Sequence, residues 1–252
     1  MSLPIGSSGD YQSWEDAERD CSGEEPETFR IQALEAAVKV ARGEAVSFRD
    51  GILHPEIEYS WPLLAGLMYV AARNRGRLRL IDFGGGPAVT YLQNRRFLRH
   101  LSDIDWRIVE RADYCAFCRQ NLRLFGVSYH ESLAQALSTG PSPDAIVLSG
   151  VLNMLPEPYQ LLRDITRAGI PHILIDRLSM NLEGRDRLAV YRVDPAHHPN
   201  MSFPNWWFDE AKLVASLKAE YDLVERFEAF HNPAPWPSER LGFIFSRRAS
   251  SS

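Results

Sequence analysis

Residues 84–86 are three consecutive glycines, and Asp82 precedes them at the end of an apolar segment. A loop without side chains lets a ligand come close to the backbone, so this pattern predicts a site for a nucleotide phosphate, a dinucleotide or S-adenosylmethionine (SAM). The phosphate-binding loop of nucleoside triphosphatases is excluded, because Pro87 and Ala88 stand where that loop requires Lys and then Ser or Thr.

Two acidic residues help to choose between a dinucleotide and SAM. The dinucleotide-binding fingerprint G-x-G-x-x-G needs Gly or Ala at its third glycine position, so that the helix can pack closely on the strand. This chain has Val89 at that position. Asp82 would repel a pyrophosphate, whereas it favours the sulfonium and ammonium groups of SAM. Glu110 ends the next apolar segment, where a carboxylate accepts both ribose hydroxyls of NAD or SAM. Glu110 therefore predicts a ligand that contains a nucleoside, and Asp82 favours SAM, which is cationic, over a dinucleotide.

Alternating strands and helices are predicted from residue 78 onward. The strands are short, rich in Ile, Val and Leu, and separated by helical segments, which is typical of right-handed βαβ units on a parallel sheet. Because ligands of such sheets bind at the carboxyl ends of the strands, Asp82 and Glu110 are expected at one edge. The predicted strands cover residues 78–83, 105–110, 127–132, 144–150 and 172–177.

The remaining segments suggest appendages to a single sheet-containing domain. Residues 1–26 are acidic and rich in Ser and Gly, which predicts a flexible arm or lid. Residues 27–76 are expected to form a helical cap, and residues 77–248 the ligand-binding domain. The aromatic and Pro-bearing stretch 178–208 is long for a connection, so we expect an irregular binding loop. A helix over 209–221 and strands over 222–230 and 241–248 complete the expected elements, the two strands forming a hairpin.

The composition points to a small-molecule partner. The formal net charge is -5 and the pI is about 5.8, with no block of Lys and Arg, which argues against nucleic acid and membrane surfaces. The longest apolar run, residues 59–72, is shorter than the ~20 residues of a membrane span, and the N-terminus lacks the features of a signal peptide. We therefore expect a cytoplasmic protein, and the oligomeric state stays open.

Cys115 and Cys118 form a C-x-x-C pair, which raises a redox or zinc site as an interpretation. No second pair or nearby His pair completes a zinc shell. Tyr114, Phe117 and Leu122 recur with the cysteines at helical spacing, so a buried helix face is expected and no metal.

Three motifs, IDFGGG, the acid-ending strand IVE and DAIVLSGVLNMLPEP, resemble those of class I SAM-dependent methyltransferases. More narrowly, the chain is similar to a bacterial methyltransferase family with an FGGG motif, a later IDR and an aromatic segment like SFPNWWFDEAKL. The resemblance covers roughly residues 27–247. It implies an α/β, Rossmann-like fold with a mainly parallel seven-stranded sheet, an antiparallel C-terminal hairpin and an N-terminal helical lid.

The resemblance also implies roles for individual residues around SAM. The chain departs from the commoner pattern at Pro87, which stiffens the loop, and at Asn153, where many relatives have Gln or His. The implied positions are Asp82, Gly84, Gly85 and Gly86 for the methionine moiety, Glu110 for the ribose, Glu131 and Ser132 beside the adenine, and Ser149, Gly150 and Asn153 at the end of the fourth strand.

Methyl transfer is an in-line displacement at an activated carbon, so the protein mainly positions the acceptor and excludes water. Aromatic faces can stabilise the sulfonium by cation–π contact, and packing is the simpler role for each. Arg177 either pairs with a carboxylate or lies on the surface. The aromatic candidates are Tyr59, Trp61, Tyr91, Phe203, Trp206 and Trp207.

No motif identifies an acceptor, and this leaves several functions open. Some enzymes similar to this chain cyclise SAM to azetidine-2-carboxylate and release methylthioadenosine; this needs a neutral amine and a folded methionine chain. Asn153 would then hydrogen-bond the amine and Asp82 would orient it or accept a proton, with Tyr91 as the third residue expected at the reacting centre. Methyl transfer to a small molecule is the first hypothesis and cyclisation the second. A dinucleotide oxidoreductase and a non-catalytic SAM-binding protein are the others.

Overall fold

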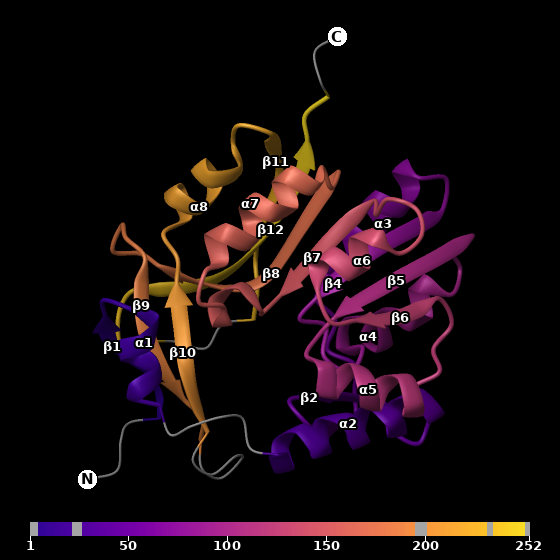
Figure 1. Ribbon diagram of the computed structural model, residues 1–252, viewed down its shortest axis with the longest axis horizontal. Helices are drawn as coiled ribbons and strands as arrows, with labels where there is room; N and C mark the ends of the chain where they lie inside the picture. The colour runs from indigo at the N-terminus through magenta and orange to yellow at the C-terminus, as the bar shows by residue number, and fades with distance from the viewer. Residues whose placement is uncertain (1–4, 22–26, 195–200, 231–233, 250–252) are drawn as a thin grey trace.

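A seven-stranded sheet lies at the centre of the computed structural model, which describes residues 5–21, 27–194, 201–230 and 234–249 (Figure 1). The strand order is β11-β12-β8-β7-β4-β5-β6, and the pairs from β8 to β6 are parallel. The hairpin of β11 and β12 adds to β8 in antiparallel orientation, as predicted. The strands are β4 (Arg77–Phe83), β5 (Asp103–Val109), β6 (Val127–His130), β7 (Ala145–Ser149), β8 (His172–Asn181), β11 (Tyr221–Glu228) and β12 (Ser238–Arg247).

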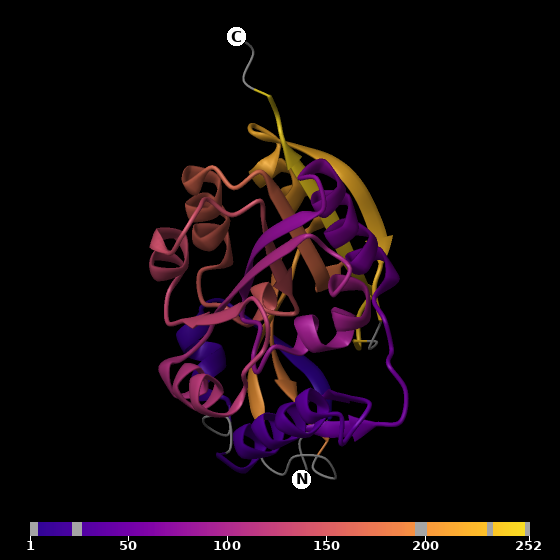
Figure 2. The same cartoon turned by 90° about the vertical axis from the view of Figure 1, so that its right-hand side faces the viewer.

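Helices cover both faces of this sheet, which explains why its central strands are apolar on both sides. Leu80 and Ile81 of β4 are both fully buried, each in a different core cluster. Figure 2 shows α3 and α7 on opposite sides of the sheet. One face carries α3 (Trp61–Arg73), α4 (Val89–Leu98) and α5 (Ala112–Asn121), with α2 (Glu27–Arg42) packed on α4 and α5. The other face carries α6 (Leu133–Ser138), α7 (Pro158–Ala168) and α8 (Glu210–Leu217).

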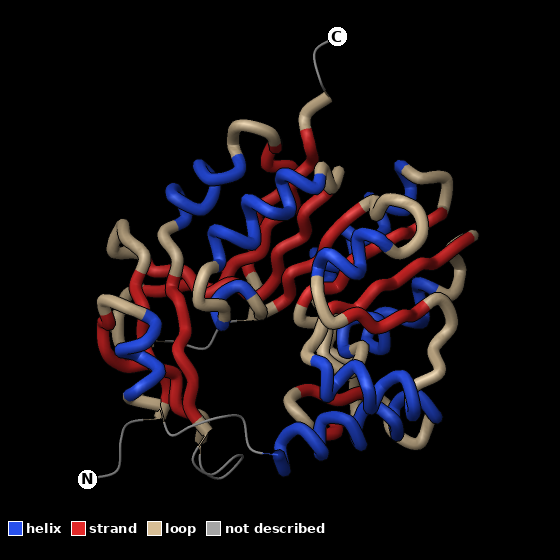
Figure 3. Tube along the Cα trace, in the orientation of Figure 1, coloured by secondary structure: helices blue, strands red, loops and turns tan. Residues whose placement is uncertain are grey.

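A second sheet of three strands lies beside the carboxyl ends of the central strands (Figure 3). It orders β1 (Gly6–Tyr11), β9 (Arg187–Arg192) and β10 (Ser202–Trp207), and α1 (Trp14–Arg19) packs on it. The prediction of an irregular loop over 178–208 was therefore wrong for the described residues, since β8 continues to Asn181 and β9 and β10 follow. Residues 195–200 of that expected loop lie outside the described part.

The strand in the N-terminal arm was not predicted, and the physical reason is its composition. The sequence of β1, GSSGDY, has no apolar alternation, so it forms a strand only because β9 supplies an antiparallel partner. Pro204 is accommodated in β10 because this strand lies at an edge of the small sheet. Residues 1–4 and 22–26 of the expected arm lie outside the described part.

The expected helical cap, residues 27–76, contains a hairpin as well as two helices. The strands β2 (Ser47–Arg49) and β3 (Ile52–His54) pair between α2 and α3. Asp50 and Gly51 have φ angles of 49° and 77°, which is the two-residue turn favoured by Asp-Gly. The Asp-Gly signal is visible in the sequence, but strands of three residues are too short to show the alternation of apolar and polar residues that identifies a strand.

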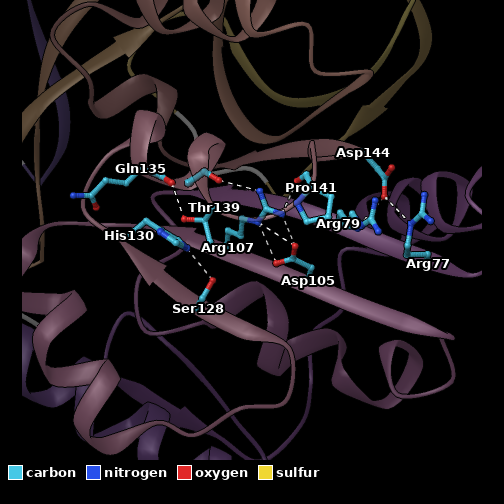
Figure 4. Close-up of polar contacts among 11 residues, drawn as sticks. Arg77, Arg79, Asp105, Arg107, Ser128, His130, Gln135, Thr139, Pro141 and Asp144 are labelled. Atoms are coloured by element: carbon cyan, nitrogen blue, oxygen red, sulfur yellow. Dashed lines mark hydrogen bonds and ion pairs between the residues drawn. The ribbon is translucent and has the colours of Figure 1, made fainter.

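A buried arginine ties β5 to the loop after α6 (Figure 4). Arg107 is fully buried, and its guanidinium pairs with Asp105 and donates to the carbonyl oxygens of Ala136 (3.0 Å) and Pro141 (2.7 Å). These contacts hold the segment that connects β6 to β7 against the sheet.

In the described residues no helix combines the length and the apolar character needed to cross a membrane.

We expect Arg107→Met to lower the free energy of unfolding by about 3 kcal/mol, because the buried Ala136 carbonyl, the Pro141 carbonyl and the Asp105 carboxylate all lose their donor. Urea denaturation measures the change. The matched control is Arg163→Met on α7, since Arg163 is exposed and bonds only Gln160 among the described residues; it should change the stability by less than about 0.5 kcal/mol. Equal stability of both variants and the wild type would contradict a structural role for Arg107.

Candidate functional site

The glycine loop follows β4 and begins α4, and its backbone needs glycine at two positions for lack of space. A Cβ atom on Gly84 would lie 2.4 Å from Val151, and one on Gly85 would lie 2.7 Å from the carboxyl carbon of Asp82. Gly84 and Gly86 also have positive φ angles, 71° and 55°. The loop therefore packs closely between Asp82 and the segment after β7.

Asp82 lies under this loop and is 1% exposed. One carboxyl oxygen, Oδ2, accepts a hydrogen bond from Trp106 Nε1 at 3.1 Å, while Oδ1 has no partner within the described chain. Burial raises the pKa of Asp82 to about 7; the Trp106 hydrogen bond opposes the shift and the nearby negative charge of Glu110 adds to it. Both protonation states of Asp82 are thus populated near neutral pH, and a cation would stabilise the ionised one.

Glu110 directly follows β5, as the sequence predicted, and its side chain reaches the glycine loop. Its Oε1 accepts from Gly86 N at 3.3 Å, and its Oε2 accepts from Arg111 N at 2.8 Å. The strand before it is held in place because Glu110 N donates to His130 O of β6 at 3.0 Å. The structure thus brings Asp82, Glu110 and the three glycines to one edge of the sheet.

Glu131 and Ser132 follow β6 at the same edge, but both side chains already have local partners. Glu131 forms an exposed ion pair with Arg119 at 3.0 Å. Ser132 caps the N-terminus of α6, because its Oγ accepts from Gln135 N at 3.2 Å. A contact of either residue with adenine stays a prediction.

Ser149 and Gly150, at the end of β7, contact the neighbouring strand β8. Ser149 Oγ donates to Asp176 Oδ2 at 3.2 Å and accepts from Arg177 Nη2 at 3.0 Å, while Gly150 N donates to Asp176 O at 2.9 Å. Asp176 is 2% exposed, and Ser60 Oγ donates to its other oxygen at 3.3 Å. Asp176 was not predicted as a site residue, although a lone acid in the apolar segment HILID is a usable signal.

Asn153 lies in a short 3₁₀ turn (Leu152–Met154) after β7 and joins the two sheets. It is 4% exposed, and its Nδ2 donates to Asn205 Oδ1 of β10 at 2.6 Å. Asn153 Oδ1 is buried with no hydrogen-bond partner in the described chain. Trp206 Nε1 donates to Leu155 O at 3.1 Å, which adds a second link between β10 and this turn. Asn205 was not predicted as a site residue, because its partner Asn153 is distant in the sequence.

Some of the predicted aromatic residues pack within the protein, and others line a cavity. Tyr91 is buried, packs edge-on against Trp106 and donates to Phe125 O at 2.9 Å, so its hydroxyl is engaged within the core. Trp207 is likewise buried and contacts Trp236. On the second sheet Phe203 lies against Tyr191, with ring centroids 5.5 Å apart. Tyr59 and Trp61 instead line the surface of a cavity together with Arg177.

This cavity has a volume of about 550 Å³ and lies between the β2–β3 hairpin, residues 55–59 and the start of α4. A second cavity of about 250 Å³ shares Tyr59, Trp61 and Arg177 with it and adds Asp176 and Phe230. Neither lining includes the glycines of the loop, but Val89, the first residue of α4, borders the larger cavity. The larger cavity therefore begins close to the end of the glycine loop, and its volume is within the range of small-molecule sites.

The cysteine pair belongs to the core, as predicted. Cys115 and Cys118 are fully buried on α5, and burial raises the pKa of both thiols, that of Cys118 to about 12. In the part of the chain that the structure describes, no group of three or more His, Cys, Asp and Glu side chains is arranged to hold a metal ion.

No protein-family model and no curated protein matches the chain. Among solved structures, the N-terminal domain of EvdMO1, determined in the presence of SAH and D-fucose, has a TM-score of 0.50 at 16% identity, covering 89% of this chain and 97% of that chain. The glycopeptide N-methyltransferase MtfA, complexed with sinefungin, has a TM-score of 0.51 at 12% identity, covering 72% and 92%.

At these identities the likeness establishes the fold alone, and the narrower resemblance to the FGGG family and to SAM-cyclising enzymes stays a prediction. The strand order, with five parallel strands and an antiparallel C-terminal hairpin, agrees with that likeness. The chain has the Rossmann-like α/β fold of class I SAM-dependent methyltransferases.

Proposed function

We propose that the protein binds SAM at the carboxyl ends of β4 and β5 and transfers its methyl group to a small-molecule acceptor. The observation that carries this proposal is the loop of residues 84–86, packed between Asp82 and Glu110. When bound, SAM supplies a methyl carbon already activated by the sulfonium. The protein then has to bind the cofactor, position the acceptor and exclude water.

The polar atoms at this edge fit a cationic ligand. Asp82 Oδ1 and Asn153 Oδ1 are both buried acceptors without partners in the described chain, and buried polar atoms are normally hydrogen-bonded. The ammonium group of SAM has three N–H donors, which would satisfy such acceptors. A dinucleotide would instead bring a pyrophosphate toward Asp82. Electrostatics therefore supports SAM over NAD.

The solved structures support the same choice. EvdMO1 was determined with SAH, the product of methyl transfer from SAM, and MtfA is a methyltransferase complexed with sinefungin. The acceptor is proposed to occupy the cavity beside α4, where Tyr59 and Trp61 offer aromatic surfaces for a small molecule.

Cyclisation of SAM is a second candidate, favoured by the same pair of acceptors. In this reaction the amine nitrogen attacks the γ-carbon of its own methionine chain, the Cγ–S bond breaks, and methylthioadenosine leaves with the bonding electrons on sulfur. The ammonium must first lose a proton. Asp82, whose pKa burial raises to about 7, is able to accept it, and Asn153 Oδ1 would orient the amine.

We expect Glu110→Ala to weaken the binding of S-adenosylhomocysteine by about 10- to 100-fold, the loss that corresponds to charge-assisted hydrogen bonds to the ribose. Isothermal titration calorimetry measures the Kd. The control is Glu220→Ala, because Glu220 pairs with Arg247 on the surface and should leave the affinity unchanged. An unaltered Kd in Glu110→Ala would contradict the ribose assignment.

The affinity for S-adenosylhomocysteine should also rise with pH through the pKa of Asp82. Below about pH 7 the raised pKa keeps this carboxyl protonated and neutral, and above it the carboxylate forms and pairs with the ligand's ammonium group. Between about pH 6 and about pH 8 the affinity should increase about tenfold in the wild type. Asp82→Asn should show a flat profile over the same range. A profile that is identical in the two proteins would refute the pairing.

The products separate the two candidate reactions. With SAM as the only substrate, a methyltransferase should form almost no product, whereas a cyclase should release methylthioadenosine and azetidine-2-carboxylate. Chromatography of the reaction after incubation with pure protein measures both. We expect almost no methylthioadenosine. If the wild type nevertheless makes it readily, cyclisation replaces methyl transfer, and Asn153→Ala should then reduce the rate far more than the affinity for SAM.

A further inference from the structure

Arg177 has an unusual backbone and marks a bulge in β8. Its φ angle is 57°, a left-handed conformation that is uncommon for a residue other than glycine. In the pairing with β12, Leu178 faces Leu241 and Ile175 faces Phe243, so that Gly242 alone faces two residues, Asp176 and Arg177. Bulges of this kind redirect side chains, and here the bulge places both of these residues at the wall of the smaller cavity.

Arg240 lies on β12 next to this bulge and is an unusual arginine. It is partly buried, its Nε is shielded from solvent, and its guanidinium makes no hydrogen bond or ion pair within the described chain. It faces Ser179 in the register, on the strand face opposite to the core residues Leu178 and Leu241. Buried charges are normally paired, so an arginine in this state is expected to bind an anion from outside the chain.

Arg177 is the strongest charged neighbour of Arg240, and the nearby carboxylates are either already bonded or exposed. Burial lowers the pKa of Arg240, and the like charge of Arg177 lowers it further; Tyr191, Asp50 and Asp176 oppose the shift. Asp176 is already bonded to Ser60 and Ser149 and lies 3.8 Å from Arg177 Nε, while Asp50 is exposed. The carboxylates at the rim of the cavity are exposed as well: Glu58, which pairs with Arg49 at 2.8 Å, and Glu228.

We propose that Arg177 and Arg240 together bind a carboxylate group of the ligand at the bulge of β8. Arginine is suited to this role, because its planar guanidinium donates two parallel hydrogen bonds to a carboxylate. The proposal deepens the proposed function, on which it rests for the identity of the ligand. The carboxylate belongs either to the methionine moiety of SAM or to the second substrate, whose aromatic surroundings would be Tyr59, Trp61 and Phe230.

The first test uses benzoate, a carboxylate with an aromatic ring, and its neutral analogue benzamide. Calorimetry with the full chain should show that benzoate binds the wild type at least about tenfold more tightly than benzamide does. Arg240→Met should remove this preference. The matched control is Arg226→Met on the adjacent strand β11, since Arg226 is exposed and pairs with Glu210 and Glu239. It should bind benzoate like the wild type.

A second arm identifies the source of the carboxylate. If it belongs to SAM, Arg240→Met should weaken S-adenosylhomocysteine by about tenfold or more and leave its decarboxylated analogue unaffected. If it belongs to the second substrate, both adenosyl ligands should bind normally, and benzoate should lose affinity even when S-adenosylhomocysteine saturates the protein. If the wild type binds benzoate but not S-adenosylhomocysteine, the proposed function is wrong, whereas the carboxylate site is supported.

Stability without ligand supplies an independent readout. Because Nε of Arg240 is buried without a hydrogen-bond partner in the described chain, Arg240→Met should be at least as stable as the wild type in urea. The proposal is overturned if Arg240→Met alters neither benzoate nor S-adenosylhomocysteine binding. A large loss of stability in this variant would also overturn it, since the guanidinium would then have structural partners.

Discussion

The carboxyl group of Asp82, buried at the end of β4 with a single hydrogen bond from Trp106, constrains the structure around it. Because the glycine loop closes directly over this group, Gly85 cannot carry a side chain, and Gly84 must leave room for Val151 after β7. Burial without a counter-ion disfavours the ionised carboxylate, and this raises its pKa toward neutrality. In the proposed function, the partner of the ligand's ammonium group is this carboxyl group. The loop after β4, the tip of β5 and the turn after β7 are all packed around it.

Two arginines lie on the other side of β7. Arg177 projects from the bulge of β8 and Arg240 lies beside it without a partner in the described chain, whereas the acid-bearing loop belongs to β4. A ligand with an ammonium and a carboxylate would find complementary charges in these two places. The second sheet, linked to the turn after β7 through Asn153 and Asn205, closes the same region from the side of β10.

The sequence predicted what depends on local pattern and missed what depends on pairing between distant segments. The parallel strands were predicted because their apolar runs are a consequence of burial on both faces, and Asp82 and Glu110 followed from their places at strand ends. By contrast, β1 exists only because β9 pairs with it, and no local pattern marks it. Asn205 and Arg240 acquire their importance from residues more than 50 positions away, Asn153 and Arg177 respectively, so single-sequence reasoning had no means to find them.

In the proposed function, an ammonium group and a ribose occupy the edge of the sheet between Asp82 and Glu110. A crystal structure of the protein with S-adenosylhomocysteine would show both groups. We expect the amino nitrogen within hydrogen-bond distance, about 3 Å, of Asp82 or Asn153, and the ribose hydroxyls at the same distance from Glu110. Electron density for the adenosyl ligand away from the glycine loop, or a ribose that does not contact Glu110, would contradict this expectation.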